Sequence, residues 1–492
     1  MYKKLFFLLL IPAICSGQIQ IGQDIYGESA RDLCGVVACS GNGNIIAVGS
    51  PENDSNGKNS GHVRVYENIQ GTWTQIGQDL EGTAPEDRNG RYIGLSTDGT
   101  ILAISSSPPT IIGVGTAPGY VRVFRNVSGS WVQIGHDIVV TNSGAMTLSA
   151  DGNTVAVGSI EDTVNGKNSG LVRIYRNVSN IWTQEGQDIN GEAALDMFGR
   201  SVSLSADGSI VAVGAPQNDG VADSAGHVRV YQNIAGSWTQ VGQDIDGEAF
   251  ADDFGNSVSL SADGTIVAGG ATGYDKPGTM YGGHGNVRVF KNISGSWTQV
   301  GQSIVGESTA DNSGYSISLS DSGTIIAIGA PYNHKWVGTS LISTGHVRVY
   351  QFISNQWVQQ GIDIDGDADS DLSGSSVSLS GDGSILAVGA NKNNGNGIDS
   401  GQVKVYDLSG VLSYDSFVKA NFNVYPNPAT EIINITLENE ILLDKVIIYT
   451  STGQIVKTAK EKAIDVSALA KGLYYVEVVT DKGKASTKVI LE

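Results

Sequence analysis

The chain has 492 residues, of which 65 are Gly and only 16% are charged, a composition that argues against a helical bundle and favours an all-β fold with many turns. A formal net charge of -20 at pH 7 disfavours nucleic acid and anionic membranes as partners, because they carry the same sign of charge. The hydrophobic content of 40% is too high for a disordered chain, and the length exceeds one ordinary core.

The first 17 residues have the pattern of a secretory signal peptide. Lys3 and Lys4 precede an apolar run from Leu5 to Ile11, and small residues lie near Gly17. The run is too short to cross a bilayer as a helix, and no other stretch is long and apolar enough to do so. We therefore expect export across the inner membrane, cleavage after Gly17, and no transmembrane span.

Seven copies of one repeat occupy residues 18–408. Variants of LSADG and of GHVRVY each occur seven times in this region. GQD or a near relative starts at Gly22, Gly77, Gly135, Gly186, Gly242, Gly301 and Gly361, a spacing of 51 to 60 residues. A unit of this length with four strand signals is typical of a β-propeller blade. The sequence therefore predicts an all-β fold, a seven-bladed β-propeller.

The fourth repeat illustrates the expected strands, which are 199–205, 209–216, 226–232 and 237–245. The first strand is rich in Ser, which suits the crowded centre of a propeller. Asp207-Gly208 supplies a tight turn between the first two strands. Trp recurs at one position of six repeats, where large rings are expected to pack between blades. These residues are Trp73, Trp131, Trp182, Trp238, Trp297 and Trp357.

The two ends of the repeat region complement each other. Residues 18–25 have the pattern of a fourth strand without the other three, and the last repeat has three strands, at 374–380, 384–390 and 401–406, without a fourth. We expect the N-terminal segment to complete the last blade, which closes the ring and removes exposed sheet edges. Cys34 and Cys39 lie on opposite faces of one expected strand, so we predict two unpaired thiols.

The stretch from Phe198-Gly199 to Val213-Gly214-Ala215-Pro216 resembles the FG-GAP repeats of integrin-α-type propellers. This resemblance implies the propeller fold and says little about function. Many FG-GAP repeats hold calcium in a loop between the first two strands of a blade. Here that connection is only the tight Asp-Gly turn, so the resemblance does not extend to calcium at that position.

Ligand binding is expected on the face that carries the variable loops. Loops between the second and third strands, and between consecutive blades, share one face, and variable loops on a rigid scaffold commonly bind ligands. A Trp336 ring can stack on a sugar, and packing of that ring back onto the blade is the alternative. The candidate ligand-binding residues are Tyr274, Asp275, Tyr281 and His284 in the fifth repeat and Tyr332, His334, Lys335 and Trp336 in the sixth.

Calcium is the candidate cofactor, at the alternating carboxylates Asp367, Asp369 and Asp371. Alternating Asp residues suit a hard cation that takes several oxygen ligands. The run lacks the Gly and the distal acid of an EF-hand loop. The alternative is that the Asp recurring before each first strand caps a turn by accepting hydrogen bonds from backbone amides.

No catalytic constellation emerges from the sequence. There is no Ser-His-Asp order, zinc spacing or phosphate-binding loop, and His62, His227 and His346 share one repeat position, which indicates a structural role. We therefore expect a binding or adhesion module for a glycan or protein rather than an enzyme. The alternatives are a secreted polysaccharide-degrading enzyme, which needs only two suitably spaced carboxylates, and a structural surface-layer component.

Residues 422–492 follow an expected linker at 409–421 and have the strand pattern of a small β-sandwich. They resemble the C-terminal sorting domain, type A, of type IX secretion substrates. The resemblance implies the secretion machinery as a partner and a location outside a Gram-negative, Bacteroidetes-type bacterium, either released or held at the outer-membrane surface. The motif residues that match are Tyr425, Pro426, Asn427, Pro428, Gly453, Gly472 and Tyr474.

Overall fold

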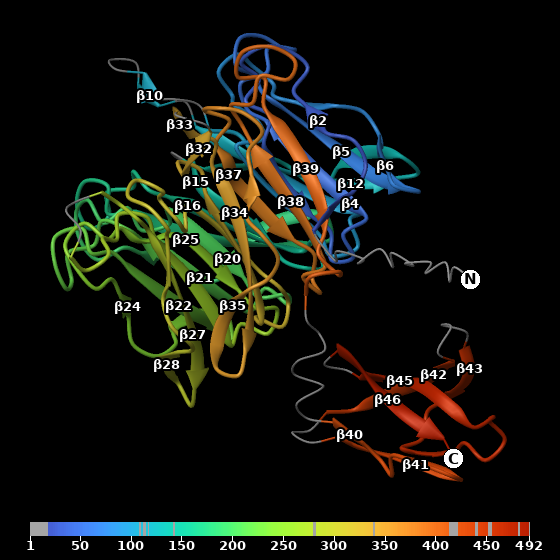
Figure 1. Cartoon of the computed structure of the whole chain (residues 1–492). Helices are drawn as coiled ribbons and strands as arrows, with labels where there is room; N and C mark the ends of the chain where they lie inside the picture. Colours follow the sequence, from blue (N-terminus) through green and yellow to red (C-terminus); the bar gives the residue numbers. More distant parts are fainter. Residues whose placement is uncertain are drawn as a thin grey trace. The chain divides into compact units, whose positions relative to one another are not determined.

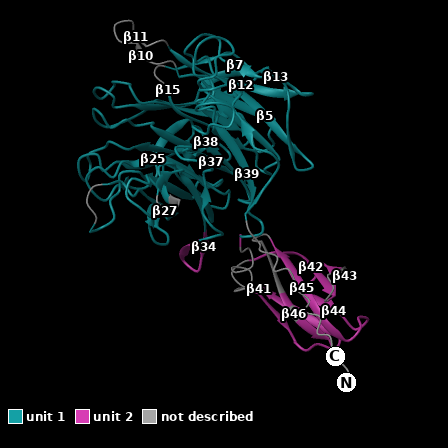
Figure 2. Cartoon of the chain, turned by 45° about the horizontal axis from the view of Figure 1, so that its top comes forward, with its two compact units in different colours: residues 1–350, 359–411 teal, residues 351–358, 412–492 magenta. Residues whose placement is uncertain are grey.

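The structure is a computed structural model (Figure 1) that describes residues 18–107, 110–111, 115–116, 118–140, 143–278, 282–337, 340–412, 422–437, 441–450, 455–480 and 483–491. These residues form strands and no helix, so the all-β prediction is confirmed. The predicted signal peptide and most of the predicted linker lie outside the described residues. Two compact units are present, 1–350 with 359–411 and 351–358 with 412–492 (Figure 2).

In the described part of residues 18–411, the strands form seven five-stranded antiparallel sheets, one for each repeat. We number the strands of a sheet from first to fourth, and a short fifth strand also pairs with the third. The first strands are β3 (Val36–Cys39), β8 (Tyr92–Leu95), β15 (Ser143–Leu148), β20 (Ser201–Leu204), β25 (Phe254–Leu260), β30 (Ser316–Leu319) and β37 (Ser373–Leu379). The second strands are β4 (Ile45–Ser50), β9 (Ile101–Ser105), β16 (Thr154–Ser159), β21 (Ile210–Ala215), β26 (Ile266–Ala271), β31 (Ile325–Ala330) and β38 (Ile385–Ala390).

The third strands are β5 (His62–Ile69), β12 (Gly119–Val127), β17 (Leu171–Val178), β22 (His227–Ile234), β27 (Asn286–Ile293), β34 (His346–Ile353) and β39 (Gln402–Asp407). The fourth strands are β6 (Thr72–Gln75), β13 (Ser130–Gln133), β18 (Ile181–Gln184), β23 (Ser237–Gln240), β28 (Ser296–Gln299), β35 (Gln356–Gln359) and β1 (Ile19–Gln20). The fifth strands are β7 (Leu80–Glu81), β14 (Ile138–Val140), β19 (Ile189–Asn190), β24 (Ile245–Asp246), β29 (Ile304–Val305), β36 (Ile364–Asp365) and β2 (Ile25–Tyr26).

The first strands form a closed ring. Each contacts the first strand of the two neighbouring sheets, in the order β3, β8, β15, β20, β25, β30, β37 and back to β3. The turns after these strands are joined by a second ring of backbone hydrogen bonds. In this ring the amide of each residue donates to the carbonyl oxygen of the next, in the order Gly41, Thr97, Ala150, Ala206, Ala262, Asp321, Gly381 and back to Gly41. The seven sheets are therefore arranged around one axis, like the blades of a propeller.

The N-terminal segment completes the last sheet, as predicted. Ile19 pairs with Asp407 and Ile25 with Val403, so β1 and β2 both lie beside β39 (Figure 1). The side chain of Gln18 continues the connection to the preceding sheet, because its Nε2 donates to the carbonyl oxygen of Ile362 at 2.9 Å. The sheet therefore joins residues from both ends of the repeat region.

The recurring Trp residues pack between sheets, as predicted. All six are buried, with exposed fractions of 3% to 5%. The indole N–H of Trp73 donates to the carbonyl oxygen of Ile21 at 2.9 Å, and that of Trp238 donates to Glu185 at 2.8 Å. Each acceptor belongs to the preceding sheet, so these rings add a polar connection to the apolar packing.

Two hairpins extend the loops between second and third strands. β10 (Thr110–Ile111) pairs with β11 (Gly115–Thr116), and β32 (His334–Val337) pairs with β33 (Ser340–Ser343). The second hairpin carries three of the predicted ligand-binding residues. It follows Tyr332, a fourth, in the loop after β31.

The described residues from 422 onward form a sandwich of two antiparallel sheets, as predicted. β40 (Phe422–Tyr425), β41 (Ile432–Leu437) and β44 (Ala463–Asp465) form one, and β43 (Ile455–Ala459), β42 (Leu443–Thr450), β45 (Gly472–Thr480) and β46 (Gly483–Leu491) form the other. Alternating apolar residues of both sheets, such as Ile433 and Val446, meet in one buried cluster.

Candidate functional site

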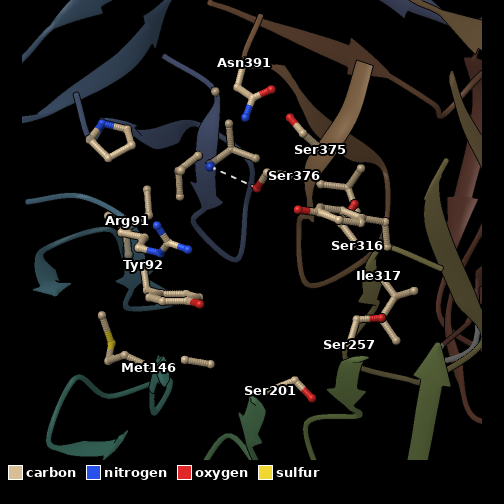
Figure 3. Close-up of a pocket in the computed structure, with 18 of the residues that line it drawn as sticks. Arg91, Tyr92, Met146, Ser201, Ser257, Ser316, Ile317, Ser375, Ser376 and Asn391 are labelled. Atoms are coloured by element: carbon tan, nitrogen blue, oxygen red, sulfur yellow. Dashed lines mark hydrogen bonds between the residues drawn. The ribbon is translucent and has the colours of Figure 1, made fainter. Parts of the chain in front are cut away.

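A cavity of about 470 Å³ lies on the axis of the ring (Figure 3). Every one of the seven first strands contributes to its wall, which fixes its position at the centre of the sheets. The wall residues from these strands include Val37, Tyr92, Met146, Ser201, Ser257, Ser316 and Ser376. Because Glu52 and Asn391, which follow second strands, also line the cavity, it lies on the face of the variable loops.

The Ser residues of the wall connect neighbouring sheets. The hydroxyl groups of Ser201, Ser257 and Ser316 donate to the carbonyl oxygens of Gly255, Gly314 and Gly374, at 2.6 to 2.8 Å. Ser376 Oγ accepts a hydrogen bond of 3.2 Å from the backbone amide of Val37, drawn as a dashed line in Figure 3. These groups recur from repeat to repeat and have structural partners. Any selectivity of the cavity must therefore come from residues that break the repeat.

Arginines are the main departure from the repeat. Arg91 and Arg200 both occupy the position directly after the Gly that precedes the innermost strand, and both line the cavity. The equivalent residues in four other repeats are Val36, Asn256, Tyr315 and Ser375. A guanidinium group at this position is therefore not needed to pack a first strand. Figure 3 shows Arg91 and Tyr92 together on one side of the cavity.

The arginines have few partners. Arg200 Nη1 donates to the hydroxyl of Tyr92 at 3.5 Å, and Arg88, a third lining arginine, has its Nη2 3.9 Å from a Glu52 carboxylate oxygen. Arg88 Nε is buried and has no hydrogen-bond partner within the described residues. The cavity wall thus carries three Arg and one Glu. The excess is positive in a chain of net charge -20.

One aromatic residue connects the cavity to a predicted loop residue. Tyr315 lines the cavity and packs edge-to-face against Tyr332, with ring centroids 6.4 Å apart. Tyr315 is 37% exposed and Tyr332 is 40% exposed. The structure therefore brings Tyr332 to the cavity, although the sequence contained no sign that Tyr315 would be its neighbour.

Tyr332 touches a lining residue, but none of the predicted loop residues that the structure describes is itself part of the cavity wall. Asp275 accepts hydrogen bonds of 2.9 Å from the amides of Gly282 and Gly283, which makes it a loop-ordering residue. His284 is buried, and Tyr274 packs on the edge of a hydrophobic cluster. In the β32–β33 hairpin, Lys335 forms an ion pair of 3.1 Å with Asp365. In the same hairpin, His334 is half-buried and the backbone of Trp336 pairs with Leu341. The side chain of Trp336 and all of Tyr281 lie outside the described residues.

The three Asp residues predicted to bind calcium each have separate protein partners. Asp367 pairs with Lys404 Nζ at 2.5 Å, and Asp369 accepts from the Ser343 amide at 2.8 Å. Asp371 is fully buried and accepts from the Ala368 amide and from Asn393 Nδ2, both at 2.9 Å. Calcium binding here stays a prediction.

The alternative role of the recurring Asp is confirmed. Asp32 accepts hydrogen bonds of 2.9 Å from the amides of Glu28 and Ser29, and Asp252 accepts equivalent bonds from Glu248 and Ala249. The same arrangement occurs, with at least one amide donor, at Asp87, Asp196, Asp311 and Asp371. Each Asp fixes the turn that leads into a first strand.

Three groups of potential metal ligands surround the recurring His residues. They are Glu28, His62 and Asp79; Glu192, His227 and Asp244; and Glu307, His346 and Asp363. An Arg already contacts each group: Arg64 lies 3.3 Å from Glu28, Arg229 lies 2.6 Å from Asp244, and Arg348 lies 3.6 Å from Glu307. A guanidinium therefore supplies the positive charge that these carboxylates need.

Burial keeps the His side chains of these groups neutral. Burial and the nearby arginine lower the pKa of His227 and of His346 to about 4, and the pKa of His62 is also lowered. A neutral His beside an Arg–carboxylate pair supports the structural role that the repeat position indicated. Cys34 and Cys39 are both free thiols, and burial raises the pKa of Cys34 to about 11, so this thiol is unreactive.

The C-terminal motif residues tie the two sheets of their domain together. Asn427 Oδ1 accepts a hydrogen bond of 2.9 Å from the amide of Ile490 in β46, and the Tyr474 hydroxyl donates to the carbonyl oxygen of Ala470 at 2.8 Å. The model of a secretion system C-terminal sorting domain family matches residues 423–492. This segment is a sorting domain. Its presence supports export by the type IX secretion system and implies secretion or attachment at the cell surface; Gly453 lies outside the described residues.

Comparison with solved structures supports the fold of the larger unit. A chain of Kuenenia stuttgartiensis hydrazine synthase is similar, with a TM-score of 0.50 and 12% sequence identity, over 78% of this chain and 97% of that chain. At this identity the likeness shows the fold alone, and it fits a propeller-like architecture. A search of curated proteins found no match. Among the described residues, no helix has the length and apolarity needed to span a membrane.

Proposed function

We propose that this protein is a type IX secretion substrate that loses residues 1–17 as a signal peptide and binds a ligand outside the cell, through the axial cavity of an FG-GAP-like, seven-bladed propeller spanning residues 18–408. The cavity carries this proposal, because residues that break the repeat converge on it from separate sheets. Its size of about 470 Å³ is in the range of small-molecule sites, about 300–1,000 Å³.

A glycan is the ligand that the cavity fits best. Tyr92 and Tyr315 offer aromatic faces, and Asn256 and Asn391 offer amide groups, a combination suited to a ring with hydroxyl groups. Asn391 Oδ1 is buried and has no hydrogen-bond partner among the described residues.

The composition of the cavity favours binding over glycoside hydrolysis. Hydrolysis of a glycosidic bond uses two carboxyl groups on opposite sides of the bond. Among the described residues, Glu52 is the single carboxylate in the cavity wall. We therefore propose an adhesin-like or receptor-like binding protein of the cell surface.

The substitution Tyr315→Ser tests this proposal. Ser occupies the same repeat position at Ser375, so the change is compatible with the strand. We expect about a tenfold loss of affinity for the best ligand of a glycan array, because stacking contacts of an aromatic ring contribute about 1–1.5 kcal/mol. The measurement is titration calorimetry of residues 18–492 with that ligand.

The matched control is Val178→Ser. Val178 is 58% exposed at the end of β17, where the turn to the fourth strand lies on the opposite face. Its affinity and its melting temperature should equal those of the wild type. Unchanged affinity of the Tyr315→Ser variant would place the ligand elsewhere and contradict the proposal, and concentration-dependent self-association without glycan binding would favour a surface-layer component.

A further inference from the structure

Of the three cavity arginines, Arg91 is exposed and Arg88 and Arg200 are half-buried, and they differ from the buried arginines of the third strands. Arg229 has a side chain that is only 9% exposed, and it is neutralised by two carboxylates, those of Asp244 and Glu192. By contrast, the Arg91 side chain has no hydrogen-bond or ion-pair partner among the described residues, and Arg200 has only the neutral hydroxyl of Tyr92. Among the described residues, neither the Arg91 nor the Arg200 guanidinium has a carboxylate partner, in contrast to the buried Arg229.

The cavity arginines retain unused hydrogen-bond donors. A guanidinium carries five N–H donors, and Glu52, the one acid among the described wall residues, lies 3.9 Å from Arg88 Nη2. The buried Nε of Arg88 is also unpartnered in the described part of the chain. A buried donor without an acceptor, such as Arg88 Nε, is unfavourable, so an anionic acceptor that reaches it gains a charge-assisted hydrogen bond.

The fold does not require these charges. Ser, Asn, Val and Tyr stand at the position of Arg91 and Arg200 in other repeats and permit the same strand pairing. Tyr92, whose hydroxyl accepts a hydrogen bond from Arg200, adds an aromatic ring to the same cavity wall. Three positive groups and an aromatic ring in the wall of one small cavity form a site for an anion carried on a compact ring.

We propose that the axial cavity recognises an acidic sugar, with the carboxylate of a uronic acid bound by Arg88, Arg91 and Arg200 and the sugar ring held against Tyr92 and Tyr315. This inference rests on the proposed function and adds the class of ligand. The cavity admits one or two sugar units, and the strongly acidic remainder of the chain repels a long polyanion such as nucleic acid. A terminal or isolated acidic sugar is therefore the ligand.

The test compares matched acidic and neutral sugars on residues 18–492. Titration calorimetry with sodium glucuronate and with glucose, at one ionic strength, should show binding of the acid and at least a tenfold weaker interaction with the neutral sugar. Inorganic sulfate, which has the charge without the ring, should compete only weakly. Raising the salt concentration should weaken glucuronate binding, because the interaction is ionic.

Arg91→Ser and Arg200→Ser should each reduce the affinity for glucuronate about tenfold, in line with a hydrogen bond to a charged group. Ser375 occupies the same repeat position, so both variants should melt at the wild-type temperature. Arg176→Ser is the control, because the 46% exposed side chain of Arg176 pairs with Glu185 outside the cavity. This control should leave the affinity unchanged.

The outcomes separate the two proposals. Binding of neutral glycans that depends on Tyr315 but not on Arg91 or Arg200 would overturn the acidic-sugar inference and leave the binding function intact. Sulfate that binds as tightly as glucuronate would overturn the role of the sugar ring. Binding of a DNA duplex that is lost in the Arg91→Ser variant would identify nucleic acid, rather than a sugar, as the ligand. A glycan array on which neither an acidic nor a neutral sugar binds the protein would count against both proposals.

Discussion

At the scale of single residues, the buried His of the third strands makes the stability of the fold depend on pH. His227 sits beside Arg229, and burial lowers its pKa to about 4. The unfolded chain binds a proton at this side chain with a pKa near the ordinary value of about 6.5. The unfolded state therefore takes up the proton first as the pH falls. The stability that neutral His227 contributes is fully present above pH 6.5 and is lost as the pH falls through 4.

The substitution His227→Gln should flatten this response. Gln occupies the same repeat position at Gln402, so the side chain is accommodated there. We expect the free energy of unfolding of the variant to fall less steeply between pH 6.5 and pH 4 than that of the wild type, which urea denaturation at several pH values measures. Parallel curves would show that this His does not titrate in the folded protein in the way its burial predicts.

At the scale of elements, the Gln of the GQD segment is a connection between sheets. The Gln187 side chain donates to the Trp238 carbonyl oxygen at 2.7 Å and accepts from the Trp238 amide at 3.1 Å. It thereby pairs with the backbone of the next sheet as a strand would. Gln23, Gln78 and Gln243 repeat the arrangement with Trp73, Trp131 and Trp297.

Replacing Gln187 by Ala should cost about 1–3 kcal/mol of unfolding free energy, since it leaves two backbone groups without partners. The loss can be measured by urea denaturation. Gln232→Ala provides the comparison, because Gln232 is exposed on β22 and its removal should change stability by less than about 0.5 kcal/mol. An equal effect of both substitutions would refute the connecting role.

The contrast between Gln187, a repeated residue, and Arg91, which breaks the repeat, explains which features could be predicted from the sequence and which could not. Strand positions, the turn-capping Asp and the Trp packing could be predicted, because each rests on a pattern that repeats seven or six times. The cavity could not, since its wall is assembled from residues about 50 to 60 positions apart that meet only when the ring closes. The available signal was a mismatch: Arg91 and Arg200 stand where other repeats have Asn256 or Ser375.

At the scale of the whole molecule, the sorting domain directs export and the repeat region is the part that is exported. Residues 423–492 match a sorting family by themselves, and the described part of them has its own core. Removal of residues 412–492 should therefore abolish passage through the outer membrane and trap the repeat region in the periplasm. Cell fractionation with detection of the repeat region would show this, and undiminished extracellular protein would contradict the role of the domain.

The pairing of β1 with β39 also constrains the order in which the sheets can fold. Ile19 lies opposite Asp407, so a strand synthesised at the start of the chain must wait for almost the whole repeat region before its partner exists. Contacts this distant in sequence carry a large loop-closure entropy and slow folding. Six of the sheets can therefore form from local segments before the seventh is completed by the N-terminal strands. Moving residues 18–26 to follow residue 407 would turn the last closure into a local hairpin and make the ring assemble faster.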